Sequence, residues 1–384
     1  MEVSPRIVKA LFSRGSACRK VLEVIRSLCR KLEARGIDRV KIMNFCGTHE
    51  WVVTHYGIRS VVPSMIELVA GPGCPVCVTP SYVIRYATEL ALEGVRVFTF
   101  GDMARVPIGA SRETLLDARA RGGRIELVYG FGDAVERARD GAESVFLAIG
   151  FETTAPSYSI PLEKGVVPRN LRLLTTVRLT PPVMRFALEI HRGVSKPVDG
   201  VIAPGHVSTV IGSEAWRFLP EEFGVATVVA GFEPLDVLIA IAKILEMVLE
   251  GVPQLFNEYR RSVKPGGNEL AKRSMERVFR VVDALWRGIG VVPESGLDLS
   301  PSYGDWDAYE YYGLEKLPRD AEAHDHPPGC LCSKIILGLA KPTDCPYFGK
   351  VCTPSTPLGP CMVSMEGTCR IWAQSYLPPK PLNR

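Results

Sequence analysis

Short apolar runs alternate with longer amphipathic stretches over most of the chain. Apolar runs of a few residues bounded by turn residues are typical of buried strands, and longer stretches with apolar residues three or four apart are typical of helices. Such runs, alternating with helices, indicate βαβ units and parallel sheets. In the first half, we expect strands at 40–45, 66–70, 95–100, 124–129 and 145–149, and helices at 18–35 and 81–93.

The same alternation resumes after Pro156 and stops near Pro293. Beyond Pro293 the chain is rich in Pro, Gly, Tyr, Asp and Cys, as in a small loop-rich module that needs a covalent or metal staple. We therefore expect an α/β protein with two Rossmann-like lobes, at 1–155 and 156–292, and a small C-terminal module at 293–384. The second lobe is expected to have strands at 171–176, 198–203 and 225–230, and helices at 182–191, 234–249 and 268–285.

Composition narrows the classes of partner. The 384 residues are 46% hydrophobic and 23% charged, and the net charge of +4 is too small and too scattered to indicate nucleic acid. The most hydrophobic stretch, 235–249, carries Asp236, Lys243 and Glu246 on one helical face, which indicates a core helix and not a membrane span. The first residues have no long apolar run of a secretory signal, so we expect a soluble, cytoplasmic protein.

Eleven cysteines are unevenly distributed along the chain. Cys18 and Cys29 lie in an expected helix and are interpreted as core residues, whereas six others lie between Cys330 and Cys369. In a reducing compartment, such a cluster indicates metal or redox chemistry. Its spacings lack the paired knuckles of most structural zinc sites, so an iron–sulfur cluster is favoured over zinc. The six residues are Cys330, Cys332, Cys345, Cys352, Cys361 and Cys369.

Cys330 and Cys332 are separated by one residue. In an extended segment, their side chains would point to opposite faces, and they would be poor joint ligands for one metal. We therefore expect one of them not to be a cluster ligand.

Four distinctive loops follow expected strands: Cys46–Glu50 (CGTHE), Gly71–Cys77 (GPGCPVC), Gly150–Thr154 (GFETT) and Ala203–Ser208 (APGHVS). In open parallel sheets, ligands bind beyond the carboxyl ends of the strands. We therefore expect these loops to converge on one cleft.

The first two loops carry the chemistry. Cys74 and Cys77 have the spacing of a reversible disulfide, the alternative being a tight turn with two buried cysteines. Cys46 and His49 have the residue types for metal binding or Cys–His chemistry. In the alternative interpretation the CGTHE loop is structural, with Thr48 as a helix cap.

Other polar residues are interpreted as structural. Glu152 and His206 are expected to satisfy hydrogen bonds at their strand ends. His324 and His326 resemble a metal-binding tract, but are interpreted as linker residues.

Together with the ending CTPSTPLGPCMVSMEGTC (352–369), these motifs resemble the HypD family of [NiFe] hydrogenase maturation proteins. The resemblance spans roughly residues 15 to 375. It implies a scaffold that works with a small partner, HypC, to assemble iron carrying two cyanides and one carbon monoxide. HypE supplies the cyanide, and the iron group then passes to the hydrogenase large subunit.

The resemblance also implies roles for the cysteines. Iron falls on Cys46, with a HypC cysteine as the other protein thiolate and His49 beside it, and Cys74 and Cys77 match a central redox pair near that iron. Cys332 and Cys361 match a second thiol pair, and the ligands of a 4Fe-4S cluster fall on Cys330, Cys345, Cys352 and Cys369.

Two alternatives remain open. A cluster-dependent protein disulfide reductase would explain the C-terminal cysteines and the Cys74/Cys77 pair, but not Cys46. A zinc-stapled binding protein without a redox role would explain the C-terminal cysteines alone.

Overall fold

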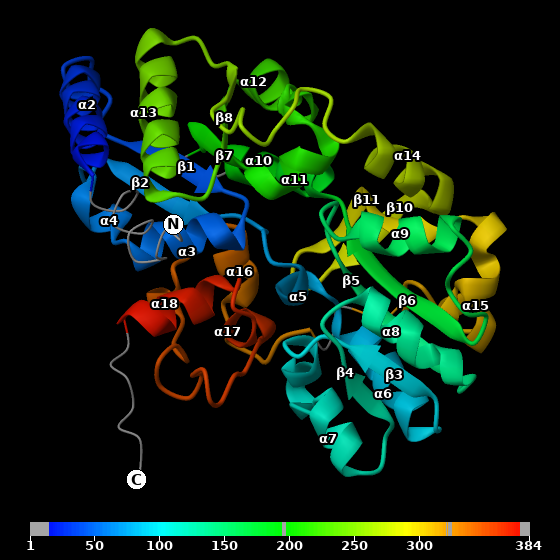
Figure 1. Ribbon diagram of the computed structural model, residues 1–384. Helices are drawn as coiled ribbons and strands as arrows, with labels where there is room; N and C mark the ends of the chain where they lie inside the picture. Colours follow the sequence, from blue (N-terminus) through cyan, green and yellow to red (C-terminus); the bar gives the residue numbers. More distant parts are fainter. Residues whose placement is uncertain (1–14, 194–196, 320, 322–324, 377–384) are drawn as a thin grey trace, which may run out of the picture.

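The strands form two separate sheets. The computed structural model describes residues 15–193, 197–319, 321 and 325–376 (Figure 1). The first sheet has the order β2-β1-β7-β8-β9, and every neighbouring pair in it is parallel. Its strands are β1 (Val40–Asn44), β2 (Ile66–Ala70), β7 (Gly200–Pro204), β8 (Ala226–Ala230) and β9 (Leu255–Asn257).

The second sheet has the order β10-β11-β6-β5-β3-β4. Strands β6, β5, β3 and β4 are parallel, whereas β10 and β11 form an antiparallel hairpin that pairs with β6. Its strands are β3 (Arg96–Thr99), β4 (Ile125–Leu127), β5 (Ser144–Gly150), β6 (Leu171–Arg178), β10 (Phe279–Trp286) and β11 (Gly290–Leu299).

Two helices stand side by side against the first sheet: α2 (Ser16–Glu33) and α13 (Pro234–Glu250) (Figure 1). Pro234 begins α13, and the Asp236 carboxylate accepts a hydrogen bond from the backbone N–H of Glu233. Gly251 ends the helix in a left-handed conformation. Cys18 and Cys29 are buried where α2 faces this core, which confirms their expected place.

The remaining helices cover the sheets or belong to the C-terminal segment. They are α3 (Gly47–His55), α4 (Ile58–Val61), α5 (Pro75–Val78), α6 (Ser81–Leu92), α7 (Leu115–Ala120), α8 (Phe131–Arg137), α9 (Ala155–Glu163), α10 (Thr180–Arg192), α11 (Gly205–Ile211), α12 (Phe218–Phe223), α14 (Glu269–Val278), α15 (Ala308–Tyr312), α16 (Cys332–Ile336), α17 (Pro360–Val363) and α18 (Thr368–Tyr376). No helix in the described ranges is both long enough and apolar enough to cross a bilayer.

The α/β class with mainly parallel sheets is confirmed, but the sheets do not follow the expected division at 155/156. The first sheet places β1 and β2 beside β7 and β8, and the second places β3 to β5 beside β6, β10 and β11. Each sheet therefore consists of two stretches of chain, and the chain crosses between the sheets several times. One crossing, after β2, carries α5.

Two expectations for the region after residue 268 are wrong. The expected helix 268–285 ends at Val278, and Phe279–Trp286 is a strand because it pairs with β11. Residues 293–312, expected in the C-terminal module, pack on the second sheet: β11 pairs with β6, and the Tyr309 hydroxyl donates to the carbonyl of Thr175. Long-range pairing thus overrides local helical periodicity here.

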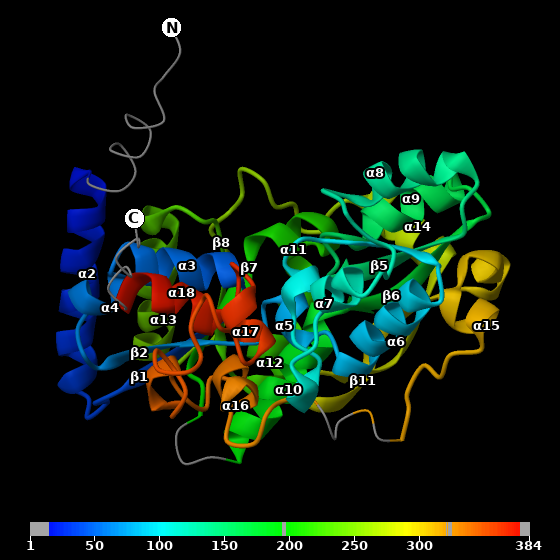
Figure 2. The same cartoon turned by 90° about the horizontal axis from the view of Figure 1, so that it is seen from below.

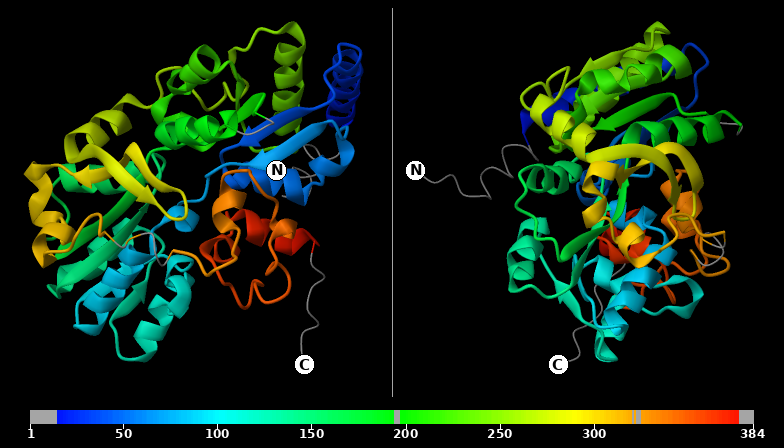
Figure 3. Two further views of the ribbon diagram at one scale, coloured as in Figure 1. Left: turned by 180° about the vertical axis from the view of Figure 1, so that it is seen from behind. Right: turned by 90° about the vertical axis from the view of Figure 1, so that its right-hand side faces the viewer.

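The cysteine-rich segment is a compact module at the junction of the two sheets. Figures 2 and 3 show α16, α17 and α18 together beside α3 and α5. Helix α18 packs on α3, and α17 packs on α5. The module therefore contacts both loops that were expected to carry chemistry.

Candidate metal and thiol site

The loops after β1 and β2 touch through their backbones. The amide of Gly47 donates to the carbonyl of Gly73 at 3.2 Å. A Cβ on Gly73 would lie 2.6 Å from the carbonyl of Phe45, and one on Gly47 would lie 2.5 Å from the carbonyl oxygen of Glu366. Glycine is needed at both positions because another backbone approaches closely.

Cys46 lies at the N-terminus of α3 as a free, partly buried thiol. Burial, and then the Glu366 carboxylate, raises the pKa of Cys46 to about 11, although the amides of His49 and Thr48 act in the opposite direction. The metal-free thiol is therefore protonated at neutral pH.

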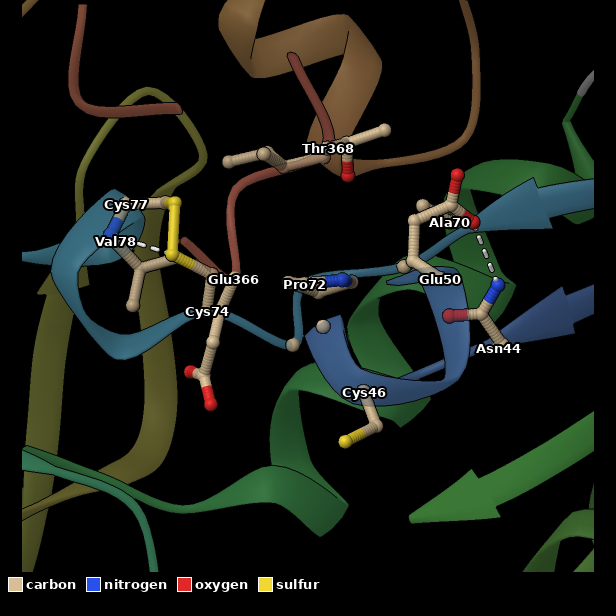
Figure 4. A pocket seen from close by; sticks show the side chains of 14 residues that line it. Asn44, Cys46, Glu50, Ala70, Pro72, Cys74, Cys77, Val78, Glu366 and Thr368 are labelled. Carbon is tan, nitrogen blue, oxygen red and sulfur yellow. Dashed lines mark hydrogen bonds between the residues drawn. A yellow bond between two sulfur atoms is a disulfide. The ribbon is translucent and has the colours of Figure 1, made fainter. Parts of the chain in front are cut away.

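Cys74 and Cys77 form a disulfide at the start of α5, where the amide of Cys77 donates to the Cys74 sulfur at 3.1 Å. Together with Cys46 and Glu366 they line one small pocket, which Figure 4 shows from close by. Its volume of about 10 Å³ is close to the least that holds one water molecule. The structure thus brings together the two loops that the sequence singled out.

His49 is directed away from this pocket. Its Nε2 contacts the carbonyl oxygen of Gly231 at 2.9 Å, and its ring stacks on Phe232, which also stacks with His206. Burial lowers the pKa of His49 to about 4, so the ring is neutral. His49 therefore packs on Phe232 and does not line the pocket of Cys46.

Glu50 ties the Cys46 helix to the C-terminal module. Its buried carboxylate accepts hydrogen bonds from Arg59 at 2.8 Å, Asn44 at 3.0 Å and the Trp372 indole at 2.7 Å. Because Trp372 lies in α18, this network joins α3 to the last described helix. This structural role for Glu50 agrees with the alternative interpretation, in which the CGTHE loop is structural.

The GFETT loop follows β5 of the second sheet. Glu152 accepts hydrogen bonds from the amide and hydroxyl of Thr180 at 2.6 Å, at the start of α10. Burial raises the pKa of Glu152 to about 7. Gly150 and Thr154 line a second, open hollow of about 520 Å³ that also borders α5 and Glu366. The GFETT loop and the α5 segment that carries the disulfide thus line a common hollow.

The six C-terminal cysteines lie in one module without a disulfide among them. The sulfurs of Cys332, Cys361 and Cys369 lie within 4.8 Å of one another. Hydrogen bonds from Cys332 and Cys369 lower the pKa of Cys361 well below its usual range. Cys345 and Cys352 are buried in the same hydrophobic core as these three cysteines.

The expectation that Cys330 and Cys332 face opposite ways is wrong. Leu331 is not extended, with φ −97° and ψ 15°, because α16 begins at Cys332. The two sulfurs consequently lie within 4.8 Å of each other and of a ring nitrogen of His326. Both are placed to contact one metal centre.

His326 was interpreted as a linker residue, and this interpretation is wrong, whereas His324 lies outside the described residues. Both ring nitrogens of His326 are buried without a hydrogen-bond partner. Burial, and then the Arg287 charge, lowers the pKa of His326 to about 3.

The donor set fits an iron–sulfur cluster. Thiolates are the usual ligands of such clusters, and buried polar groups without partners indicate that something further belongs in the site. Besides the His326 nitrogens, Nη1 of the buried Arg287 has no partner. A Cβ on Gly359 would lie 3.0 Å from the Cys332 sulfur, so the backbone there makes room for the thiols.

Sequence reasoning missed Glu366 and Arg287 and assigned His326 to a linker. Glu366 stands three residues before Cys369, and His326 stands four before Cys330, so proximity to the cysteines was the available signal. Arg287 has no such signal, because it lies in the turn between β10 and β11.

Comparisons with known proteins show which proteins this chain is similar to. The family model described as HypD, hydrogenase formation hypA family, matches residues 17–376. A Methanocaldococcus jannaschii protein named for hydrogenase expression and formation is 45% identical over 92% of this chain and 96% of its own length. The hydrogenase maturation factor HypD of Azotobacter vinelandii is 39% identical over 88% and 90%, and that of Escherichia coli K12 is 36% identical over 92% and 94%.

Proposed function

Because the chain belongs to the HypD family of hydrogenase maturation factors, we propose that it is the scaffold on which the iron group of a [NiFe] hydrogenase is assembled. In this proposal it works with HypC, receives cyanide from HypE, and passes iron with two cyanides and one carbon monoxide toward the hydrogenase large subunit. The observation that carries the proposal is the free Cys46 thiol in one pocket with the Cys74–Cys77 disulfide.

Cys46 is proposed to hold the iron cargo together with a HypC cysteine. Thiolates are soft ligands that suit iron with strong-field partners. Cys46 is free and only partly buried, so a partner's sulfur can approach it. Its raised pKa means that iron must displace a proton when it binds.

Cys74 and Cys77 are proposed to be the redox pair of this pocket. Reduction of their disulfide requires two electrons and two protons and leaves two more thiols beside Cys46. Helix α17, which carries Cys361, packs on α5. This contact supports the proposal that electrons pass from the Cys332/Cys361 thiol pair to the disulfide.

Cys330, Cys345, Cys352 and Cys369 are proposed to hold a 4Fe-4S cluster. When bound, it supplies single electrons. The burial of Cys345, Cys352 and Cys369 and the donors without partners around Cys330 support a metal centre here.

A cluster-dependent protein disulfide reductase is the second candidate. It accounts for the C-terminal cysteines and for the Cys74–Cys77 disulfide. It gives no role to Cys46, whose loop is in backbone contact with the Gly73 loop. The scaffold is therefore favoured.

The decisive experiment is anaerobic co-expression of the full chain with HypC and HypE, followed by infrared spectroscopy of the purified complex. We expect bands in the cyanide and carbonyl regions, together with iron and acid-labile sulfide. A spectrum without these bands, from a complex with its iron and sulfide present, would count against the scaffold. Turnover of protein disulfides without any partner would favour the reductase, and a colourless zinc protein would exclude the cluster.

A further inference from the structure

The His326 ring occupies a fixed position beside the thiols. A Cβ on Gly288 would lie 2.4 Å from its Nε2, and a Cβ on Gly359 would lie 3.9 Å from its Nδ1 and 3.8 Å from the Cys330 sulfur. The ring therefore lies between two glycines, with Nδ1 on the side of the thiols.

An imidazole with both nitrogens buried and unpaired is costly. A buried donor without a partner costs free energy, because it has given up its hydrogen bond to water. Within the described residues its nearest sulfurs are those of Cys330 and Cys332, within 4.8 Å. A neutral imidazole keeps one N–H, and a thiolate or cluster sulfur is an acceptor for it.

The neighbouring Arg287 points to the same kind of partner. Its side chain is fully buried, Nε donates to the carbonyl of Asp325 at 2.8 Å, and Nη2 donates to the carbonyl of Pro107 at 2.9 Å. The third nitrogen, Nη1, has no partner. A buried cation with a spare donor beside thiols suits a negatively charged occupant.

We propose that His326 is a positioning residue that donates a hydrogen bond to the Cys330 sulfur in the metal-loaded protein and thereby raises the reduction potential of the metal centre. This inference rests on the proposed function in one respect, that the C-terminal cysteines hold an iron–sulfur cluster. Reduction adds negative charge to the cluster sulfurs, and a hydrogen-bond donor stabilises the reduced form more than the oxidised one.

The test uses the full chain purified anaerobically, with iron and sulfide analysis and a potentiometric titration followed by electron paramagnetic resonance. His326→Leu removes the donor, and His326→Gln restores one on a neutral side chain. His326→Phe keeps a ring without an N–H and replaces the Leu variant if that variant does not fold. His55→Leu removes the imidazole at the C-terminal end of α3 and serves as the control.

We expect His326→Leu to keep its iron and sulfide but to shift its midpoint to a more negative potential. At the wild-type midpoint we expect its reduced-to-oxidised ratio to fall about tenfold, the lower limit of the change in metal affinity or activity that loss of a metal ligand's hydrogen-bond partner typically causes. His326→Gln should recover most of the shift, and His55→Leu should show none.

Three outcomes would overturn the inference. A His326→Leu protein with full iron content and the wild-type reduction potential would contradict the proposed role of His326. It would not affect the proposed scaffold function. Loss of iron from both the Leu and Gln variants would make His326 a ligand instead. A wild-type chain without iron and sulfide overturns the proposed cluster and this inference together.

Discussion

The indole N–H of Trp372 donates to Oε1 of Glu50 at 2.7 Å, across 322 residues of sequence. Trp372 lies in α18, which begins at the residue before Cys369, and Glu50 lies four residues after Cys46. One buried hydrogen bond therefore joins the cysteine module to the helix that presents the proposed iron-binding thiol.

Removing this bond should loosen the module. We expect Trp372→Phe to lower the free energy of unfolding by ~1.5–3 kcal/mol, because the acceptor is a buried, charged carboxylate. Trp306→Phe is the matched control, since its indole donates to the neutral carbonyl of Val167 at 3.3 Å and should contribute ~0.5–1.5 kcal/mol. Urea unfolding checks both, and equal losses would contradict the special role of Glu50.

Replacing the proposed iron ligand should separate function from fold. Cys46→Ala is expected to fold and to keep the iron of the C-terminal module, but to abolish hydrogenase maturation in a host without its own copy. Cys29→Ala, at a buried cysteine in α2, should mature hydrogenase normally. Normal maturation by Cys46→Ala would show that the iron assignment is wrong.

The protonated Cys46 thiol predicts a pH dependence. Because the thiolate is the reactive form and the pKa is about 11, alkylation of the metal-free chain at Cys46 should rise about tenfold per pH unit from pH 7 to 10. Peptide mass spectrometry after timed treatment with iodoacetamide measures this rate. Glu366→Gln should react faster at each pH, because it removes a charge that raises the pKa. A plateau below pH 9 would contradict the prediction.

Glu152 predicts a pH-dependent stability. Its folded pKa of about 7 lies above its usual value, so the folded chain binds an extra proton between about pH 4.5 and 7. Stability should therefore fall as pH rises through this window, by on the order of 3 kcal/mol. Chemical unfolding at several pH values should show a flatter profile for Glu152→Gln, and an unchanged profile would mean that the carboxyl titrates normally.

The contact between Gly47 and Glu366 predicts a steric effect. Gly47→Ala places a Cβ 2.5 Å from a backbone oxygen, and we expect a loss of ~1–3 kcal/mol together with displacement of the Glu366 loop. Gly132→Ala in α8 is the control, because a Cβ there meets nothing within 4 Å and should be neutral or slightly stabilising. Thermal unfolding of both variants decides the point.

Local pattern was sufficient for most strands and for the meeting of two loops. Strand β2 lies at 66–70, as expected, and the carboxyl-end rule brought the Cys46 loop to the Cys74 loop. Local pattern failed where pairing with another strand determines the secondary structure, as in Phe279–Trp286. Apolar runs identify buried strands but do not show which strands are neighbours, so the mixed origin of each sheet was not predictable.

The cysteine module shows the same limit. The spacing of the cysteines indicated a metal site, but the turn at Leu331 brings Cys330 and Cys332 together instead of apart. His326 and Glu366 gain their positions from packing against glycines in other segments. No local signal reports such packing.

The pairing of β1 with β7 constrains when the site forms during synthesis. The amide of Lys41 in β1 donates to Asp199, 158 residues later, and Ile42 pairs with Gly200 in β7. Contacts so distant in sequence form slowly and only after the later strand has emerged from the ribosome. The Cys46 loop therefore lacks its neighbouring strand β7, and the α18 helix whose Trp372 donates to Glu50, until those later segments have been made. The surroundings of Cys46 are thus completed late, because Trp372 lies 322 residues after Glu50 in the chain.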